Sequence, residues 1–250
     1  MKRTNPYISA ESFEKDIKDF ANKHHAHFSQ HSDKLSQYFE MACYNLIVHY
    51  YEKCGYKLEA KNLKGGDFKY KCSPLGHLNN FSYFKASKTV EGEENEVFYI
   101  FHNATCQSFY DKMVFTSPDI VVSKSDIPGE TNDYYETKMV LKFVKNKDLL
   151  TFCEAKQMVP FPELMITFIG TVSELKPTCL TVGEVSNHIA PTLMMSRTMS
   201  KHCKRIKNSL EDRYFINFFS DLIDSPLSNV LSNLDGITTM SRKKTKTDET

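Results

Sequence analysis

One change of pattern along the chain limits its possible folds more than any other feature. Between residues 33 and 55, apolar side chains recur every three or four positions and Gly55 ends the run, which predicts a helix. From residue 56 onward, short segments rich in aromatic and β-branched residues alternate with glycine and proline, which is typical of strands. We therefore expect an α/β fold in which helices pack on the faces of a mixed sheet.

The composition is that of a chain with one sizeable core. The 250 residues are 40% hydrophobic and 25% charged, which disfavours disordered, collagen-like and disulfide-framework proteins. The longest apolar stretch, residues 164–172, is about half as long as a membrane-spanning helix. The N-terminus lacks the apolar core of a secretory signal, and seven cysteines without a Cys-x-x-Cys pair indicate reduced thiols and no structural zinc. We expect a cytoplasmic protein with no membrane partner.

The remaining segments predict an order of elements and three regions of the chain. We expect a main domain over residues 33–220, with a peripheral helical segment before it (1–32) and a short helix and basic tail after it (221–250). A polar stretch at 123–148 reads as an insertion into the main domain. The expected elements are strands at 81–88, 96–102, 118–122, 149–153 and 179–185, a helix at 160–175, and a mostly helical stretch at 190–219.

Several acidic residues lie at the ends of predicted strands or on the first predicted helix. Asp119 follows a proline at the head of a predicted strand, and Glu40 lies on the first helix. Glu154 and Lys156 belong to a Glu-Ala-Lys run at the end of a buried strand. Together with the element order, these residues resemble the PD-(D/E)xK nuclease superfamily. The resemblance covers about residues 33–185 and implies a restriction-endonuclease-like fold, a mixed central sheet flanked by helices with an αβββαβ core.

The resemblance also implies roles for individual residues. In that superfamily the two motif carboxylates bind Mg²⁺ together with the backbone carbonyl of the residue between Glu and Lys. Here these groups correspond to Asp119, Glu154 and the carbonyl of Ala155. A glutamate on the preceding helix often completes the metal site, which corresponds to Glu40. The lysine at Lys156 orients or deprotonates the attacking water and stabilises charge on the phosphate, and we expect Mn²⁺ to substitute for Mg²⁺. Gln157, the next residue, is a further candidate for contact with the scissile phosphate or a water.

These residue types suit phosphodiester hydrolysis for a physical reason. The reaction places negative charge on the phosphate oxygens, and hard oxygen ligands hold the hard cation that neutralises this charge. Two carboxylates about 4 Å apart repel each other by about 4 kcal/mol at an effective dielectric constant near 20. A cluster of carboxylates therefore resists full ionisation until a cation binds.

The Glu-x-Lys pattern occurs three times, so position must decide between the copies. The copies begin at Glu59, Glu136 and Glu154, and only the third follows a largely apolar run and precedes a helix that starts at proline. Glu136 lies closer to Asp119 along the chain than Glu154 does. We favour Glu154, and Glu136 remains the alternative.

A local basic stretch is hidden by the net charge of +1. Residues 189–210 contain no aspartate or glutamate. Arg197, Lys201 and either Lys204 or Arg205 recur there at steps of three and four, which predicts one basic helix face for a phosphate backbone. Such contacts position a nucleic acid without reading its sequence.

We expect a Mg²⁺-dependent endodeoxyribonuclease whose partner is nucleic acid, with DNA favoured. Two alternatives stay open: an inactive nuclease-fold protein that binds nucleic acid or a protein partner, and an RNA nuclease. A homodimer is compatible with each. Convergence of Asp119, Glu154 and Lys156 in space favours the enzyme, and their separation favours the binding protein.

Overall fold

The computed structural model describes residues 35–73, 76–89, 95–184, 186–222 and 237–240. The predicted peripheral segment at 1–32 and most of the predicted C-terminal segment at 221–250 lie outside the described residues. Among the described residues, no helix has the length and apolar character needed to cross a membrane.

The centre of the molecule is a mixed seven-stranded sheet with the order β1-β2-β3-β6-β9-β10-β11. Neighbouring strands from β1 to β9 are antiparallel, whereas β9, β10 and β11 run parallel to one another. The expected mixed α/β sheet is confirmed at this level. The strands are β1 (Lys57–Lys61), β2 (Tyr83–Lys88), β3 (Glu96–His102), β6 (Ile120–Ser123), β9 (Leu149–Lys156), β10 (Thr192–Met195) and β11 (Asn217–Phe219).

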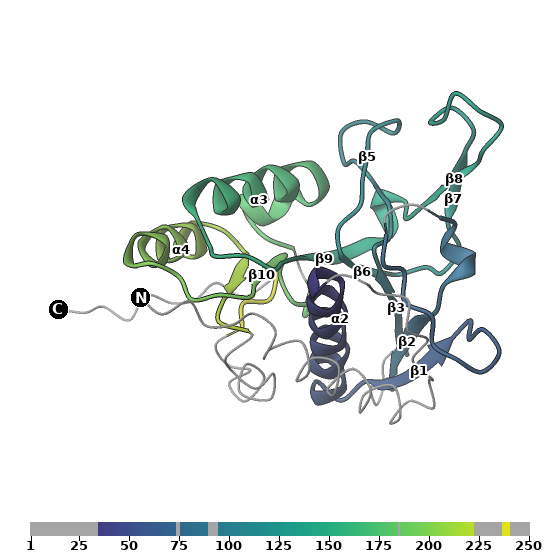
Figure 1. Ribbon diagram of the computed structural model, residues 1–250, viewed down its shortest axis with the longest axis horizontal. Helices are drawn as coiled ribbons and strands as arrows, with labels where there is room; N and C mark the ends of the chain where they lie inside the picture. Colours follow the sequence, from purple (N-terminus) through teal and green to yellow (C-terminus); the bar gives the residue numbers. More distant parts are fainter. Residues whose placement is uncertain (1–34, 74–75, 90–94, 185, 223–236, 241–250) are drawn as a thin grey trace.

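Helices cover both faces of this sheet (Figure 1). α2 (Leu35–Lys53) packs on one face in one buried cluster, and α3 (Pro162–Leu175) and α4 (Lys201–Arg213) pack on the other face in a second cluster. Alternate residues of β9 enter the two clusters, Cys153 on the α2 side and Phe152 on the α3 side. The strand that carries the Glu-Ala-Lys run is therefore buried from both sides.

The two best-predicted helices are confirmed, and the packing explains why they form. α2 buries most of its length, and the Tyr44 hydroxyl donates a 2.8 Å hydrogen bond to the Ile100 carbonyl of β3. α3 starts at Pro162, whose fixed φ suits the first helical position, and buries four residues spaced by three and four: Met165, Phe168, Val172 and Leu175.

Two hairpins are inserted between strands of the central sheet. β4 (Cys106–Gln107) and β5 (Phe115–Thr116) pair between β3 and β6, and β7 (Gly129–Thr131) and β8 (Leu141–Phe143) pair between β6 and β9. The predicted insertion at 123–148 thus includes a hairpin. Figure 1 shows both hairpins extending from one side of the sheet. Three short 3₁₀ turns complete the fold: η1 (Leu78–Asn80), η2 (Asn146–Asp148) and η3 (Pro177–Leu180).

Two predicted elements in the last third of the chain are wrong. The strand expected at 179–185 is instead the end of η3 followed by a turn, because Pro177 begins a 3₁₀ helix there. The stretch at 190–219 is not mostly helical, since β10 and β11 flank α4. Leu and Met in β10 have high helix propensity, but Leu193 and Met194 face opposite clusters, and this two-sided burial selects a strand.

Candidate active site

Strand register brings the two motif carboxylates together. Ile120 of β6 pairs with Cys153 of β9, so Asp119, directly before β6, lies beside Glu154. Glu154 and Lys156 are two residues apart on β9 and therefore project from the same face of the sheet. Asp119 and Glu154 are far apart in the sequence, with the β7–β8 hairpin between them. The antiparallel pairing of β6 with β9 brings them side by side.

Lys156 lies between the two carboxylates. Its ammonium Nζ is 2.9 Å from Asp119 Oδ2 and 2.8 Å from Glu154 Oε2. The backbone N–H of Ala155 donates a further 2.7 Å hydrogen bond to Asp119 Oδ2. The three predicted motif side chains thus form one hydrogen-bonded group.

Burial and charge together shift the pKa values in this group. The side chains of Asp119 and Glu154 are only 10% and 14% exposed, whereas that of Lys156 is 35% exposed. Burial, and then the charge of Asp119, raises the pKa of Glu154 to about 7. Burial alone would lower the pKa of Lys156, but the charges of Glu154 and Asp119 outweigh it and raise that pKa above its usual range.

Glu40 approaches the same group from α2. Burial raises the pKa of Glu40 to about 7, and the charge of Asp119 acts in the same direction, while Asn103 and Lys156 oppose it. Asn103 Nδ2 lies 3.4 Å from Glu40 Oε2 as a hydrogen-bond donor. Glu40 is thus electrostatically coupled to the motif residues, although it belongs to the helix on the other face of the sheet.

The other predicted residues divide by position. Gln157 follows β9 and is half-buried, and no hydrogen bond joins its side chain to another described residue. Glu136 is exposed in the connection between β7 and β8, so the position beside Asp119 belongs to Glu154 and not to this alternative.

The donor chemistry of the group suits a hard divalent cation. Glu40, Asp119 and Glu154 could supply oxygen ligands. Burial and the charge of Asp119 disfavour ionisation of Glu40 and Glu154, and a bound cation would offset both effects. Among the described residues, however, no three His, Cys, Asp or Glu side chains converge closely enough to form a ready metal site. The Lys156 ammonium bridges two of the carboxylates, so metal binding requires it to shift.

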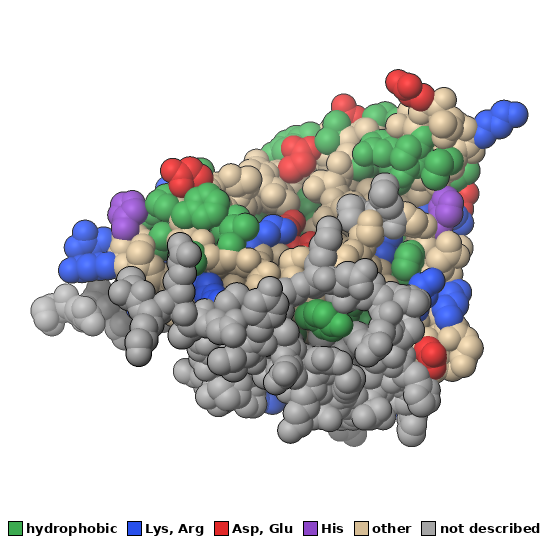
Figure 2. All heavy atoms as spheres, viewed as in Figure 1, with side chains coloured by type: hydrophobic (Ala, Val, Ile, Leu, Met, Phe, Trp, Pro, Cys, Tyr) green, Lys and Arg blue, Asp and Glu red, His purple; other side chains and the backbone are tan. Residues whose placement is uncertain are grey.

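The predicted basic face is only partly helical. Lys201, Lys204 and Arg205 are exposed on α4, but Arg197 lies before the helix, which begins after the Ser200 cap. The expected single helical face including Arg197 is therefore wrong, because β10 and its connection occupy that part of the chain. Figure 2 shows Lys and Arg side chains at the left end of the molecule, in the region of α4 in Figure 1.

Two buried residues beside the site carried no decisive sequence signal. Asn103 follows β3 with a φ of 51°, and its backbone N–H donates a 2.7 Å hydrogen bond to the Asp119 carbonyl. Lys71, only 1% exposed, donates from Nζ to the Asn103 carbonyl over 2.7 Å. In the sequence, an asparagine after an apolar strand is only a weak indication of a functional site, and an isolated lysine gives no indication.

His102 belongs to the core instead of the carboxylate group. Its ring lies 5.3 Å from that of Tyr44 and 5.8 Å from that of Tyr70, on the α2 side of the sheet. Burial lowers the pKa of His102 to about 4, which keeps the imidazole neutral near pH 7.

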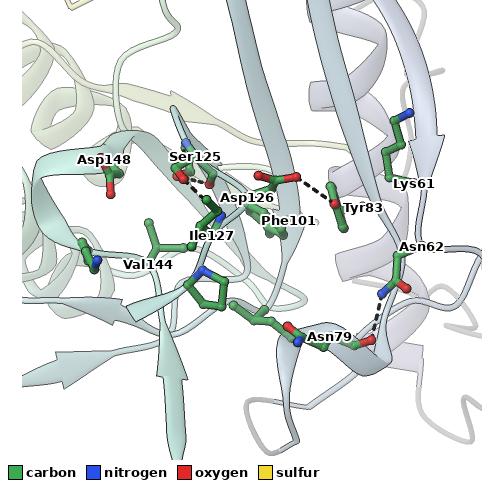
Figure 3. Close-up of a pocket in the computed structure, with 14 residues that line it drawn as sticks. Lys61, Asn62, Asn79, Tyr83, Phe101, Ser125, Asp126, Ile127, Val144 and Asp148 are labelled. Atoms are coloured by element: carbon green, nitrogen blue, oxygen red, sulfur yellow. Dashed lines mark hydrogen bonds between the residues drawn. The ribbon is translucent and has the colours of Figure 1, made fainter. Parts of the chain in front are cut away.

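A separate cavity of about 550 Å³ lies at the other end of β6 (Figure 3). Ser123, the last residue of β6, lines it, whereas Asp119 precedes the first. Figure 3 shows Asp126 and Tyr83 pointing toward each other across this cavity, joined by a 3.2 Å hydrogen bond. None of the predicted site residues lines the cavity, so the carboxylate group is an independent site.

Comparisons of the chain with protein-family models, with curated proteins and with solved structures find no match. The functional argument therefore depends on the geometry of the residues themselves.

Proposed function

We propose that the protein is a Mg²⁺-dependent endodeoxyribonuclease. The observation that carries the proposal is the hydrogen-bonded group of Asp119, Glu154 and Lys156, formed by residues far apart in the sequence. Perturbed and mutually coupled ionisable groups that converge in this way are typical of functional sites.

The strand pairing supports a restriction-endonuclease-like core. β3, β6 and β9 form consecutive antiparallel pairs, and β10 lies parallel to β9. α2 precedes these strands and α3 connects β9 to β10. This order is compatible with the αβββαβ core that the resemblance implies, with β1 and β2 added between α2 and β3 and β11 added at the other edge of the sheet.

In the proposed reaction, the carboxylates of Asp119 and Glu154 and the Ala155 carbonyl would hold Mg²⁺, and Glu40 would support the site. The bound cation would neutralise charge on the phosphate and lower the pKa of a water. Lys156, released from its carboxylate partners, orients the attacking water and donates hydrogen bonds to the phosphate oxygens. Mn²⁺ has the same ligand preference and substitutes for Mg²⁺.

The exposed cations of α4 support a nucleic-acid substrate. Lys201, Lys204 and Arg205 offer charges that bind phosphates without reading bases. All seven cysteines are free thiols, which fits the cytoplasm as the compartment.

The test compares Lys156→Ala and Asp119→Asn with a matched control, Lys61→Ala. Lys61 ends an identical Glu-Ala-Lys run on β1, where it pairs with Glu59 at an exposed position. We expect each site variant to lose roughly 10²- to 10⁴-fold in Mg²⁺-dependent cleavage, and the control to retain activity. Single-stranded DNA, duplex DNA and RNA are assayed in parallel, and faster cleavage of RNA assigns an RNA nuclease. Full activity in either site variant contradicts the proposal.

One observation favours a second candidate, an inactive nuclease-fold protein that binds nucleic acid or a protein partner. Lys156 already neutralises both motif carboxylates, as a structural ion-pair network does. A thermal-shift titration with Mn²⁺ separates the two functions, since a metal enzyme gains stability on binding the cation. An unchanged melting temperature favours the binding protein.

A further inference from the structure

A buried asparagine joins three separate segments beside the carboxylate group. The side-chain Nδ2 of Asn103 donates to the Lys71 carbonyl over 2.8 Å and reaches Glu40 Oε2 over 3.4 Å. Its backbone N–H donates to the Asp119 carbonyl over 2.7 Å. Asn103 thus contacts α2, the chain before β2 and Asp119, the residue directly before β6.

Lys71 holds Asn103 in place through a reciprocal pair of hydrogen bonds. Lys71 accepts from Asn103 Nδ2 at its carbonyl and donates from Nζ to the carbonyls of Asn103 and Ser73, each over 2.7 Å. Both residues are buried. Because a buried ammonium is costly unless it is hydrogen-bonded, this arrangement restricts Asn103 to one conformation.

The backbone of Asn103 explains the choice of residue. Its φ of 51° lies in the left-handed region, which glycine and asparagine tolerate better than most residues. Glycine provides the same backbone, but it lacks the amide that reaches Glu40. The side chain therefore adds an interaction that the turn alone does not need.

We infer that Asn103 is a positioning residue that holds the Glu40 carboxylate beside the Asp119 segment, from which it would act as a third oxygen ligand once Lys156 shifts. The inference rests on the proposed function. Glu40 is half-buried on α2, and because burial disfavours the ionised carboxylate, a hydrogen-bond donor beside it stabilises that form. Asn103 supplies that donor.

Asn62 is a matched control within the same chain. It also has a left-handed backbone, with a φ of 54°, and its Nδ2 donates to the carbonyls of Asn79 and Phe81 over 2.9 and 2.7 Å. These contacts involve no carboxylate. Asn62→Gly thus removes the same kind of amide hydrogen bonds from the same kind of backbone, away from Glu40.

The first test needs neither metal nor substrate. Crystal structures of the wild-type protein and Asn103→Gly are compared at neutral pH. Glycine keeps the left-handed backbone and the N–H donor to Asp119, so we expect the fold to persist while the Glu40 carboxylate turns away from Asp119. An unchanged Glu40 rotamer overturns the inference, even if the protein proves to bind no metal.

The second test measures Mn²⁺ binding by calorimetry. We expect Asn103→Gly to weaken Mn²⁺ roughly 10-fold or more, as the loss of an outer partner of a metal ligand typically does, and Asn62→Gly to change it less than about 2-fold. In a Glu40→Gln background, Asn103→Gly should have no further effect, because both variants remove one interaction.

Separate outcomes distinguish the inference from the proposed function. Equal weakening by the two asparagine variants, or additive effects of Asn103→Gly and Glu40→Gln, overturns the positioning role. Should Asn103→Gly fail to fold, Glu40→Gln decides alone: unchanged Mn²⁺ affinity overturns the inference. If the wild-type protein binds no Mn²⁺, the proposed function fails, and the crystal structures decide the placement of Glu40.

Discussion

Charge balance governs the candidate site at the scale of single residues. Asp119 and Glu154 both contact the ammonium of Lys156, and Glu40 lies within the electrostatic influence of Asp119 and Lys156. Full ionisation of the three acids would leave excess negative charge in a partly buried space. Burial raises the pKa values of Glu40 and Glu154 to about 7, and the charge of Asp119 adds to both shifts. Near neutral pH, Glu40 and Glu154 are therefore partly protonated, which reduces the negative charge of the group.

This balance predicts how stability depends on pH in the metal-free protein. Unfolding returns the pKa values of Glu40 and Glu154 from about 7 to near 4.5, so between these values the folded state binds more protons than the unfolded state. Their contribution to the free energy of unfolding is present below about pH 4.5 and is lost as the pH rises through 7. Urea unfolding between pH 5 and 8 measures it.

Glu154→Gln is the matched variant for this measurement, since glutamine does not titrate. We expect the free energy of unfolding of Glu154→Gln to fall less between pH 5 and 8 than that of the wild-type protein. Identical pH dependence in the two proteins contradicts the raised pKa of Glu154.

At the scale of elements, α4 carries the charges assigned to substrate binding. Ser200 caps this helix by accepting a 3.2 Å hydrogen bond from the Cys203 N–H, and Cys203 and Leu210 face the core. The exposed positions are therefore free to carry cations without a cost in packing. In the proposed function, α4 would supply attraction to phosphates and β9 would supply the reacting groups.

A triple variant tests this division of roles. Lys201→Gln, Lys204→Gln and Arg205→Gln together should weaken DNA binding and reduce the slope of log affinity against log salt by up to about 0.9 for each lost phosphate contact. Fluorescence anisotropy at several salt concentrations measures the slope.

The control replaces three exposed lysines outside α4 with glutamine: Lys112 and Lys138 in the two hairpin connections, and Lys147 in η2. Both triple variants change the net charge equally. Equal loss of affinity would show a general charge effect and contradict a specific role for α4.

At the scale of the whole molecule, β9 lies where the antiparallel part of the sheet meets the parallel part. Its partner on one side is β6, which brings Asp119, and on the other side is β10, which follows α3. Clusters on both faces bury this strand, so the positions of Glu154 and Lys156 depend on the packing of the entire sheet.

Gly183 tests the packing at the far end of the chain. Its φ is +76°, and a Cβ there would collide with the Met240 carbonyl and the Phe215 ring. We expect Gly183→Ala to lower the free energy of unfolding by at least about 2 kcal/mol, from backbone strain and overpacking together. Chemical denaturation measures the change.

Gly65→Ala separates strain from packing. Gly65 also has a positive φ, +65°, but a Cβ there meets open space among the described residues. We expect a cost of only about 1 kcal/mol from the left-handed backbone. Equal costs at the two positions contradict close packing around Gly183.

By itself, the sequence determined the elements whose signals are local. The helical repeat of α2, the proline start of α3 and the apolar run before Glu154 were sufficient, because propensity and periodicity act over a few neighbouring residues. The resemblance to the PD-(D/E)xK superfamily, and not periodicity, singled out Asp119, Glu154 and Lys156. The sequence did not reveal β10, whose Leu and Met residues form a strand only through burial on both sides.

Only the tertiary structure decided which side chains meet. The register of β6 against β9 places Glu154, which the sequence favoured, and not Glu136 beside Asp119. The packing of α2 on the sheet places Glu40 within the electrostatic influence of Asp119. Asn103 and Lys71 became visible as parts of the same site only in the folded chain. The physical reason is that hydrogen bonds and charges act over a few ångströms in space, whatever the distance along the chain.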